Sequence, residues 1–423
     1  MTPALGRLKS RGLQRLEAGF VDPIGMGGRL LRRAHRAHGR PWRVLLVPPY
    51  APGSLGDEAI MMASIDYLEQ RGVDRIGVVE YSANGTWSGL RPSLRPVYLP
   101  WHSRLRFLSA PHRLAAAVAE YDEVLFLGTD VLDGLYSERD TATRLALARL
   151  TARTGTPTSI VSFSLDRPTR GARAAWSRLP PSVRLRPRDP LSAARLSHWL
   201  RKPNQLSADL AFLLQPAEGC NPVRALEGWT QPRRSSGRVL VGVNLNGGAA
   251  FYSPEQGSDA VVRLYRRTLV ELARMDVEFS FVLLPHDWRG HPSDNDLAVA
   301  LFESLPEEIR RESLHVPGPY RAAEAKAMCG HLDLAITGRM HLAVAALGRG
   351  VPTVCVPHQE RKIMGLLQHV GTGAAAVDLR MAARRGNFAD QLISVIRNRR
   401  KLREEIQAEL PRLKRLAELN LTP

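Results

Sequence analysis

Arg339 and His341 lie two residues apart, and their chemistry suits an anionic substrate. A guanidinium binds phosphate or carboxylate through a planar fork of N–H donors. An imidazole can gain or lose a proton near neutral pH. Lys362, at the end of the loop that follows, adds another cation. These side chains predict an anion site with a proton donor.

The residues around this pair predict a strand, a helix and a second strand. Residues 332–336 form a short apolar run, and Gly338 makes the turn after it. Residues 340–347 favour a helix, and residues 351–356 are apolar and β-branched, as in a buried parallel strand. Arg339 and His341 would then lie between the carboxyl end of a strand and the amino end of a helix. Open α/β sheets bind ligands there, and the helix dipole favours an anion.

A glycine-containing loop follows the strand predicted at residues 43–47 and precedes a helix over 57–70. Gly53 and Gly56 would let the backbone approach a ligand, with Ser54 and Asp57 beside them. The glycine spacing does not match a dinucleotide fingerprint, and no Gly-Lys-Ser/Thr sequence indicates a P-loop. Asp57 is also suited to cap the helix, which needs no ligand.

Other polar residues follow predicted strands. Asp130 could accept a proton from a sugar hydroxyl, although aspartate is also common in turns. Asn244 suits hydroxyl or phosphate recognition, although Asn-Gly sequences are ordinary in turns. His286 ends the next strand and is a further candidate ligand for the substrate. The spacing of the histidines and aspartates from 286 to 296 fits no common zinc pattern, so no metal site is predicted.

Arg188 follows a basic strand predicted over residues 183–186 and precedes a helix. From the residues alone, the interpretation is a solvated basic strand edge paired with Asp189.

Strands alternate with helices along the chain, which is typical of parallel sheets covered by helices. We expect an α/β protein with two doubly wound, Rossmann-like domains that face a cleft, as in GT-B glycosyltransferases. The predicted divisions are a basic arm over residues 1–41, a first domain over 42–220, a linker over 221–237, a second domain with the donor site over 238–388, and a C-terminal helix over 389–423, broken at Pro411.

The net charge of +18 favours acidic partners, although arginine on solvated surfaces would also produce it. The basic arm could attract anionic lipid or simply be solvated. No signal peptide or membrane span is apparent, and the three cysteines are scattered. We therefore expect a cytoplasmic protein, with peripheral contact at the inner membrane face as a further option. Aromatic residues are sparse at 6%, which makes nucleic acid an unlikely partner.

Several of these segments together resemble the polysaccharide pyruvyl transferase family. Its members carry an S/T-G-R-x-H segment, here Thr337 to His341, then a Gly-Val-Pro strand and a loop that ends in lysine. They also carry G-N-x-G-D-E, R-D-x-x-S and D-x-A-F segments. The corresponding residues here are Gly53 to Glu58 with Ser54 in place of the asparagine, Arg188 to Ser192, and Asp209 to Phe212.

The resemblance implies transfer of a pyruvyl group from phosphoenolpyruvate, the donor substrate, to sugar hydroxyls in polysaccharide or glycoconjugate biosynthesis. Arg188, Arg339 and Lys362 would bind the donor and His341 would protonate it, with Asp130 as a second catalytic candidate. No cofactor is implied. The acceptor would be a saccharide, free or lipid-linked. Asp209 is interpreted as structural.

Two other functions are compatible with the sequence. A nucleotide-sugar-dependent glycosyltransferase of similar build would use Arg339 and Lys362 on a diphosphate. A non-catalytic protein would use its basic surface to bind anions or nucleic acid.

Overall fold

The computed structural model describes residues 42–81, 86–99, 110–247, 257–290, 292–356, 360–371, 374–376 and 387–422. These residues form two compact units, each with its own parallel sheet and core. The first unit comprises the described parts of residues 1–52, 65–207 and 420–423. The second comprises those of residues 53–64 and 208–419.

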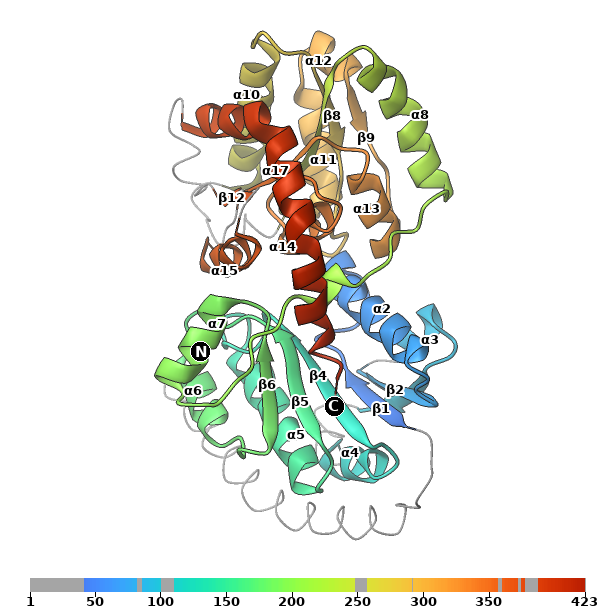
Figure 1. Ribbon diagram of the computed structural model, residues 1–423, viewed down its shortest axis with the longest axis vertical. Coiled ribbons are helices and arrows are strands. Elements are labelled where there is room, and N and C mark those ends of the chain that lie inside the picture. The colour runs from blue at the N-terminus through green and yellow to red at the C-terminus, as the bar shows by residue number, and fades with distance from the viewer. Residues whose placement is uncertain are drawn as a thin grey trace. The chain divides into compact units, whose positions relative to one another are not determined.

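The first unit contains a six-stranded parallel sheet in the order β3-β2-β1-β4-β5-β6, with helices beside it (Figure 1). Its central strands are apolar and fully buried, which places the core between sheet and helices. Its strands are β1 (Arg43–Val47), β2 (Arg75–Glu80), β3 (Arg95–Tyr98), β4 (Glu123–Thr129), β5 (Thr158–Phe163) and β6 (Val183–Pro187). Its helices are α3 (Trp87–Leu90), α4 (Ala110–Val118), α5 (Glu138–Arg153), α6 (Arg170–Ser177), α7 (Pro190–Trp199) and the second half of α2 (Leu55–Gln70).

The second unit repeats this topology with the order β12-β11-β10-β7-β8-β9. Its strands are β7 (Val239–Asn244), β8 (Phe279–Leu283), β9 (Ser313–His315), β10 (Leu334–Thr337), β11 (Thr353–Cys355) and β12 (Ala374–Ala376). Its helices are the first half of α2, α8 (Asn221–Ser235), α10 (Gly257–Ala273), α11 (Asp294–Ser304), α12 (Glu307–Arg311), α13 (Ala322–Cys329), α14 (Met340–Leu347), α15 (Glu360–Val370) and α17 (Asn387–Glu418), with a 3-10 turn, η2, at Leu210–Phe212.

The prediction of two doubly wound α/β units is therefore confirmed. In each sheet the first strand lies beside and parallel to the fourth, so the order in which strands are added across the sheet reverses there. Ligands bind at this position in open α/β sheets, outside the carboxyl ends of the strands. In the second unit β10 pairs with β7, with Thr337 opposite Asn244.

Some local predictions need correction. The segment expected as a linker, 221–237, contains helix α8 because Pro222 lies in the first turn, where a proline loses no hydrogen bond, and Val223 and Leu226 are buried at helical spacing. The apolar run at residues 208–214 predicts a further strand, but the structure has the turn η2 there. The C-terminal helix α17 continues through Pro411 instead of breaking there.

In the part of the chain that the structure describes, no helix is both long enough and apolar enough to cross a bilayer.

Candidate active site

The junction of β10 and α14 presents Arg339 and His341 as predicted. β10 ends at Thr337, Arg339 is the N-cap of α14, and His341 is its second residue. The Arg339 N–H donates to Thr337 Oγ1 at 2.9 Å, and that hydroxyl donates to Asn244 Oδ1 at 2.9 Å. Gly338 is required because a Cβ there would lie 2.7 Å from Asn246 Cβ. The start of the helix is thus tied to the end of the neighbouring strand.

Arg339 is held by two carboxylates of the same unit. Its Nε and Nη2 donate to Asp294, at 3.0 Å to Oδ2 and 2.7 Å to Oδ1, and Nη1 lies 3.5 Å from Asp287 Oδ2. Burial would lower the pKa of Arg339, but Asp294 and Asp287 outweigh that effect and raise it. The guanidinium is therefore a fixed cation, and one edge of its fork is already occupied by protein.

Asp294 is fully buried and connects several segments. Besides Arg339 it accepts from the Gly247 N–H at 2.8 Å, the His286 N–H at 3.3 Å and Asn244 Nδ2 at 3.2 Å. Asn244 Nδ2 also donates to the Leu284 carbonyl, and the whole residue is buried. Asn244, predicted to contact substrate, instead uses its amide to hold Asp294 and Thr337.

His341 lies between a buried carboxylate and a glycine backbone. Its Nε2 is 3.6 Å from Asp209 Oδ2, and Asp209 is buried at the start of η2, where it accepts from the Ala211 N–H at 2.9 Å. On the other side, a Cβ at Gly56 would lie 2.2 Å from His341 Nδ1. Only glycine at position 56 leaves room for the imidazole in this orientation.

The glycine loop predicted from sequence contacts the same region, within the second unit. Ser54 forms an isolated antiparallel bridge with Asp287, and Gly53, at φ +135°, packs against Arg289. Asp57 Oδ2 lies 3.8 Å from Arg289 Nη1. Helix α2 begins at Leu55, so Asp57 lies in its first turn and is not the N-cap that the sequence predicted.

His286 is buried beside His341 and Arg339. Among the described residues neither ring nitrogen has a hydrogen-bond partner. Burial lowers the pKa of His286 to about 3, and the nearby charges of His341 and Arg339 act in the same direction. The ring is therefore neutral near pH 7 and has donor and acceptor capacity to offer a ligand.

Asp130 and Arg188 both follow strands of the first unit. Asp130 comes after β4 and accepts from the Tyr136 hydroxyl at 2.9 Å. Arg188 comes after β6, is buried, and donates from Nε to Ser164 Oγ at 2.8 Å. Asp189, also buried, caps α7, so the interpretation of a solvated strand edge is wrong. The side chain of Lys362 lies outside the described part of the structure.

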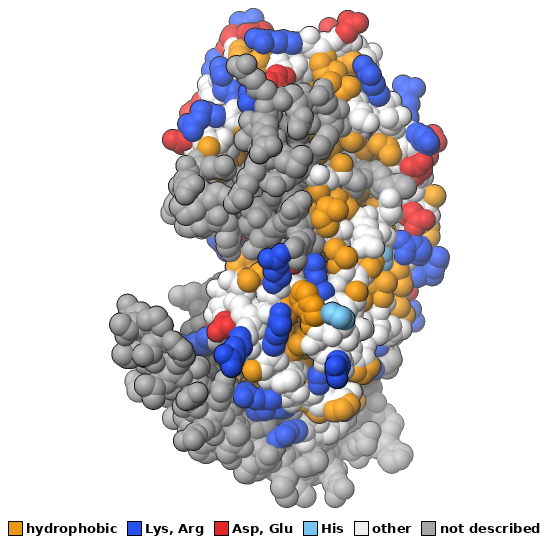
Figure 2. Space-filling view, turned by 90° about the vertical axis from the view of Figure 1, so that its left-hand side faces the viewer, with side chains coloured by type: hydrophobic (Ala, Val, Ile, Leu, Met, Phe, Trp, Pro, Cys, Tyr) orange, Lys and Arg blue, Asp and Glu red, His pale blue; other side chains and the backbone are white. Residues whose placement is uncertain are grey.

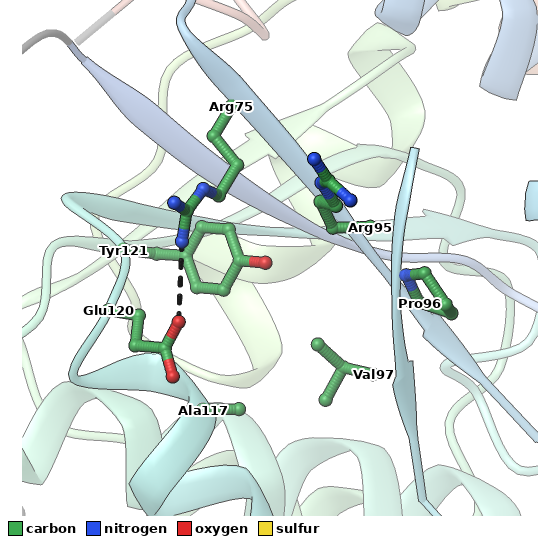
Figure 3. A pocket seen from close by; sticks show the side chains of 7 residues that line it. All are labelled: Arg75, Arg95, Pro96, Val97, Ala117, Glu120 and Tyr121. Carbon is green, nitrogen blue, oxygen red and sulfur yellow. Dashed lines mark hydrogen bonds and ion pairs between the residues drawn. The ribbon is translucent and has the colours of Figure 1, made fainter. Parts of the chain in front are cut away.

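A pocket of about 360 Å³ in the first unit lies at the amino ends of strands β2 and β3 (Figure 3). Arg75 and Arg95 open strands β2 and β3 there, and Arg75 Nη1 lies 3.4 Å from Glu120 Oε2 beside the Tyr121 ring. Asp130 and Arg188 follow the carboxyl ends of their strands, whereas this pocket lies at the amino ends. It is therefore separate from the candidate residues.

Comparison with known proteins decides the family. The family model for polysaccharide pyruvyl transferase matches residues 55–360, well over half of the chain. The chain belongs to the polysaccharide pyruvyl transferase family. The matched segment of this family member contains Gly56, Arg188, Arg339 and His341 and ends just before Lys362. Membership makes the chain a transferase. No curated protein matches the sequence significantly.

Solved structures similar to this pyruvyl transferase family member support its fold. UDP-GlcNAc 2-epimerase from Neisseria meningitidis, bound to UDP-GlcNAc, aligns with a TM-score of 0.54 at 12% identity, over 89% of this chain and 98% of that one. The UDP-GlcNAc 2-epimerase from Methanocaldococcus jannaschii gives 0.52 at 13%, over 85% and 92%. UGT2 of Phytolacca americana gives 0.52 at 12%, over 90% and 97%. At such identities the likeness concerns the fold alone.

Sequence reasoning missed the roles of Asp294 and Asp209 in this family member. Asp294 is one of the histidines and aspartates from 286 to 296 whose spacing predicts no metal site, and the capping box of Ser293 and Asp296 is the available signal that a helix starts there. Asp209 was interpreted as structural, yet it faces the candidate proton donor. Among the described residues no cluster of three or more His, Cys, Asp or Glu side chains is arranged to hold a metal ion.

Replacing Asp294 by alanine should lower the free energy of unfolding by about 3–5 kcal/mol, because it leaves the partly buried Arg339 without its main counter-ion. Denaturant unfolding measures this change. The matched control is Glu271→Gln, which breaks a surface pair with Arg267 and should cost about 0.5 kcal/mol or less. Adding Arg339→Met to Asp294→Ala should recover part of the loss. Equal losses in Asp294→Ala and the control would contradict the structural role of the ion pair.

His286 should make the protein sensitive to acid. Its folded pKa of about 3 lies below the ordinary 6.5, so the unfolded chain binds a proton first as the pH falls. The stability that neutral His286 contributes is complete above about pH 6.5 and is lost progressively below it. From pH 7 to pH 5 the wild type should lose about 2 kcal/mol more than His286→Gln in urea unfolding. The exposed-residue control His112→Gln should behave as the wild type does, and identical slopes in all three proteins would show that His286 titrates normally.

Proposed function

We propose that this chain transfers the pyruvyl group of phosphoenolpyruvate to sugar hydroxyls and forms a pyruvate ketal on a saccharide acceptor. Family membership supports a pyruvyl transferase. The observation that carries the proposal is His341 at the start of α14, with its Nε2 3.6 Å from the buried carboxylate of Asp209. In this proposal the imidazole is the proton donor, and its position at the carboxyl end of the sheet, where α/β proteins bind ligands, supports that role.

The reaction needs a proton at one defined atom. A proton added to the methylene of phosphoenolpyruvate makes it a methyl group and leaves positive charge on the adjacent carbon. A sugar hydroxyl attacks that carbon and loses its proton, and phosphate departs with the C–O bond electrons. A second hydroxyl then adds to the cationic carbon and loses its proton, which closes the ketal. His341 is the proposed acid. Asp209 orients the ring through Nε2, and Gly56 gives it space.

The donor is an anion, so cations must hold it. Arg339 contributes a charge that Asp294 and Asp287 fix in place, and its Nη1 edge is the part of the fork that Asp294 does not occupy. His286, neutral and without a partner among the described residues, can donate an N–H to an oxygen of the donor. Arg188 and Lys362 are the further proposed ligands, and Asp130 is the proposed base for an acceptor hydroxyl.

The scheme requires no cofactor beyond the donor substrate. The acceptor is a saccharide that is free or linked to a lipid, and the proposed location is the cytoplasm or the inner face of the membrane.

Phosphate release from phosphoenolpyruvate, measured with a panel of lipid-linked and nucleotide-linked sugars, tests this function. His341→Ala should lower kcat by about 10²–10⁴-fold, the usual contribution of a general acid. Asp209→Asn should lower kcat, because Asp209 contacts the imidazole of the proposed acid. The KM for phosphoenolpyruvate should change little, because Asp209 is not among the proposed ligands of the donor. The control His112→Ala removes an exposed imidazole of the first unit and should leave kcat unchanged.

A wild-type rate in His341→Ala would contradict the assignment of the acid. Thermal stabilisation by nucleotide sugars, with none by phosphoenolpyruvate, would instead support a glycosyltransferase.

A further inference from the structure

Exposed apolar side chains gather in one part of the first unit. Of the five large hydrophobic residues exposed in the described chain, three are Leu135 at 44%, Tyr136 at 43% and Trp199 at 37%. Leu135 and Tyr136 lie in the loop after β4, and Trp199 ends α7. Three such side chains near one helix are unusual on a surface that otherwise exposes charged groups.

Helix α6 joins these side chains into one surface. The loop after β4 packs on α6, because a Cβ at Gly134 would lie 2.5 Å from Thr169 Oγ1 and 3.2 Å from Ala172 Cβ. On its other side, Arg173 of α6 stacks over the Trp199 ring at 5.4 Å from the centroid. Arg195 of α7 lies over the same ring at 5.9 Å. We call this surface the α6–α7 face, and it consists of Leu135, Tyr136, Arg167, Arg170, Arg173, Arg195, Trp199, Arg201 and Lys202.

The α6–α7 face is strongly basic. Arg167, Arg170, Arg173 and Arg201 are exposed, and Arg195 and Lys202 are half-buried. Figure 2 views the side on which α6 and α7 lie, and its lower half shows Lys and Arg side chains beside apolar ones with little acidic colour. The nearby acids lie at its borders: Asp166 pairs with Arg195 at 3.7 Å, Glu138 accepts from the Gly171 N–H, and Asp130 accepts from Tyr136.

Part of this positive charge has no acidic partner among the residues that the structure describes. Arg167, Arg170 and Arg201 have no ion-pair partner among the described residues. The exposed arginines of α12 differ, since Arg310 and Arg311 both pair with Glu307. On ordinary solvated surfaces, basic and acidic side chains are interspersed, as they are on α12. The α6–α7 face instead combines unpaired arginines with an exposed tryptophan, tyrosine and leucine.

We infer that the α6–α7 face docks on the surface of an anionic phospholipid bilayer. Lipid headgroups supply the negative charge that the unpaired arginines lack. Tryptophan and tyrosine are the side chains that favour the headgroup level, where one end of the ring is apolar and the other is wet. Leu135 would insert at the boundary between the lipid headgroups and the acyl chains. Nucleic acid offers an aliphatic side chain no such apolar layer. Stacking of Arg173 and Arg195 on Trp199 keeps cations beside the ring as it is buried.

The docking surface would bring the carboxyl edge of the first sheet close to lipid. Leu135 and Arg167 lie in the loops that follow β4 and β5, and Asp130 lies in the first of these loops. This step rests on the proposed function: a transferase held there would receive a saccharide acceptor that carries a lipid.

Co-sedimentation of the full chain with vesicles tests the docking surface. The protein should bind phosphatidylcholine vesicles that contain phosphatidylglycerol, fail to bind phosphatidylcholine alone, and dissociate as salt rises. Arg167→Glu/Arg170→Glu should weaken binding at least about tenfold. The matched control Arg263→Glu/Arg274→Glu changes exposed arginines at α10 and just after it by the same total charge, and should weaken binding about twofold at most.

The apolar contribution is tested by Trp199→Ala, alone and with Leu135→Ser. These variants should weaken vesicle binding at least about tenfold while they leave the salt-dependent retention on duplex DNA unchanged. Equal weakening by the two charge-reversal variants would overturn the inference in favour of general attraction to a basic chain. Tighter binding to duplex DNA than to vesicles, unaffected by Trp199→Ala, would overturn it in favour of nucleic acid. Phosphate release with a soluble acceptor stays at the wild-type rate in all these variants, which separates failure of docking from failure of the proposed function.

Discussion

The buried pair of Asp294 and Arg339 determines the arrangement of the second unit's ligand-binding edge. Asp294 has no exposed surface, so its charge must be matched by a cation and by hydrogen-bond donors. It is matched by Arg339 at the start of α14, by the amide of Asn244 at the end of β7, and by the backbone of Gly247 and His286. One carboxylate therefore joins the ends of neighbouring strands to the first turn of the helix that carries His341. The main role of Arg339 is to anchor that helix. Only its Nη1 edge, which Asp294 does not occupy, is proposed to bind the substrate.

Local sequence patterns predicted the strand and the helix that position Arg339 and His341. The helix expected over residues 340–347 is α14, and the strand expected before it is β10, one or two residues shifted. This success has a physical cause: a buried parallel strand is a short apolar run, and a glycine turn with a basic residue marks where the helix begins. Helix α8 was missed because its prolines and serines resemble a loop, although its apolar residues keep helical spacing.

The contacts that complete the site join distant segments, and local patterns do not encode them. Asp209 approaches His341 across more than a hundred residues, and Gly56 meets the same ring from the first turn of α2, the helix that follows the first strand of the chain. The segment 53–64 belongs to the second unit although the strand before it belongs to the first. The glycines of this segment predicted that another group approaches its backbone closely, but they do not indicate that this group is the His341 ring. Asn244 was likewise predicted as a ligand because the sequence does not reveal that Asp294 occupies its amide.

In the proposed mechanism, the His341 imidazole, oriented by Asp209 and accommodated by Gly56, protonates the methylene of an enol phosphate. Mass spectrometry of the pyruvylated product formed in D₂O tests this chemistry most directly. We expect one solvent-derived deuterium in the methyl group of each pyruvate ketal, because one of the three methyl hydrogens must arrive during the reaction. A product formed in D₂O with no deuterium in that methyl group would contradict protonation at the methylene and with it the role of His341.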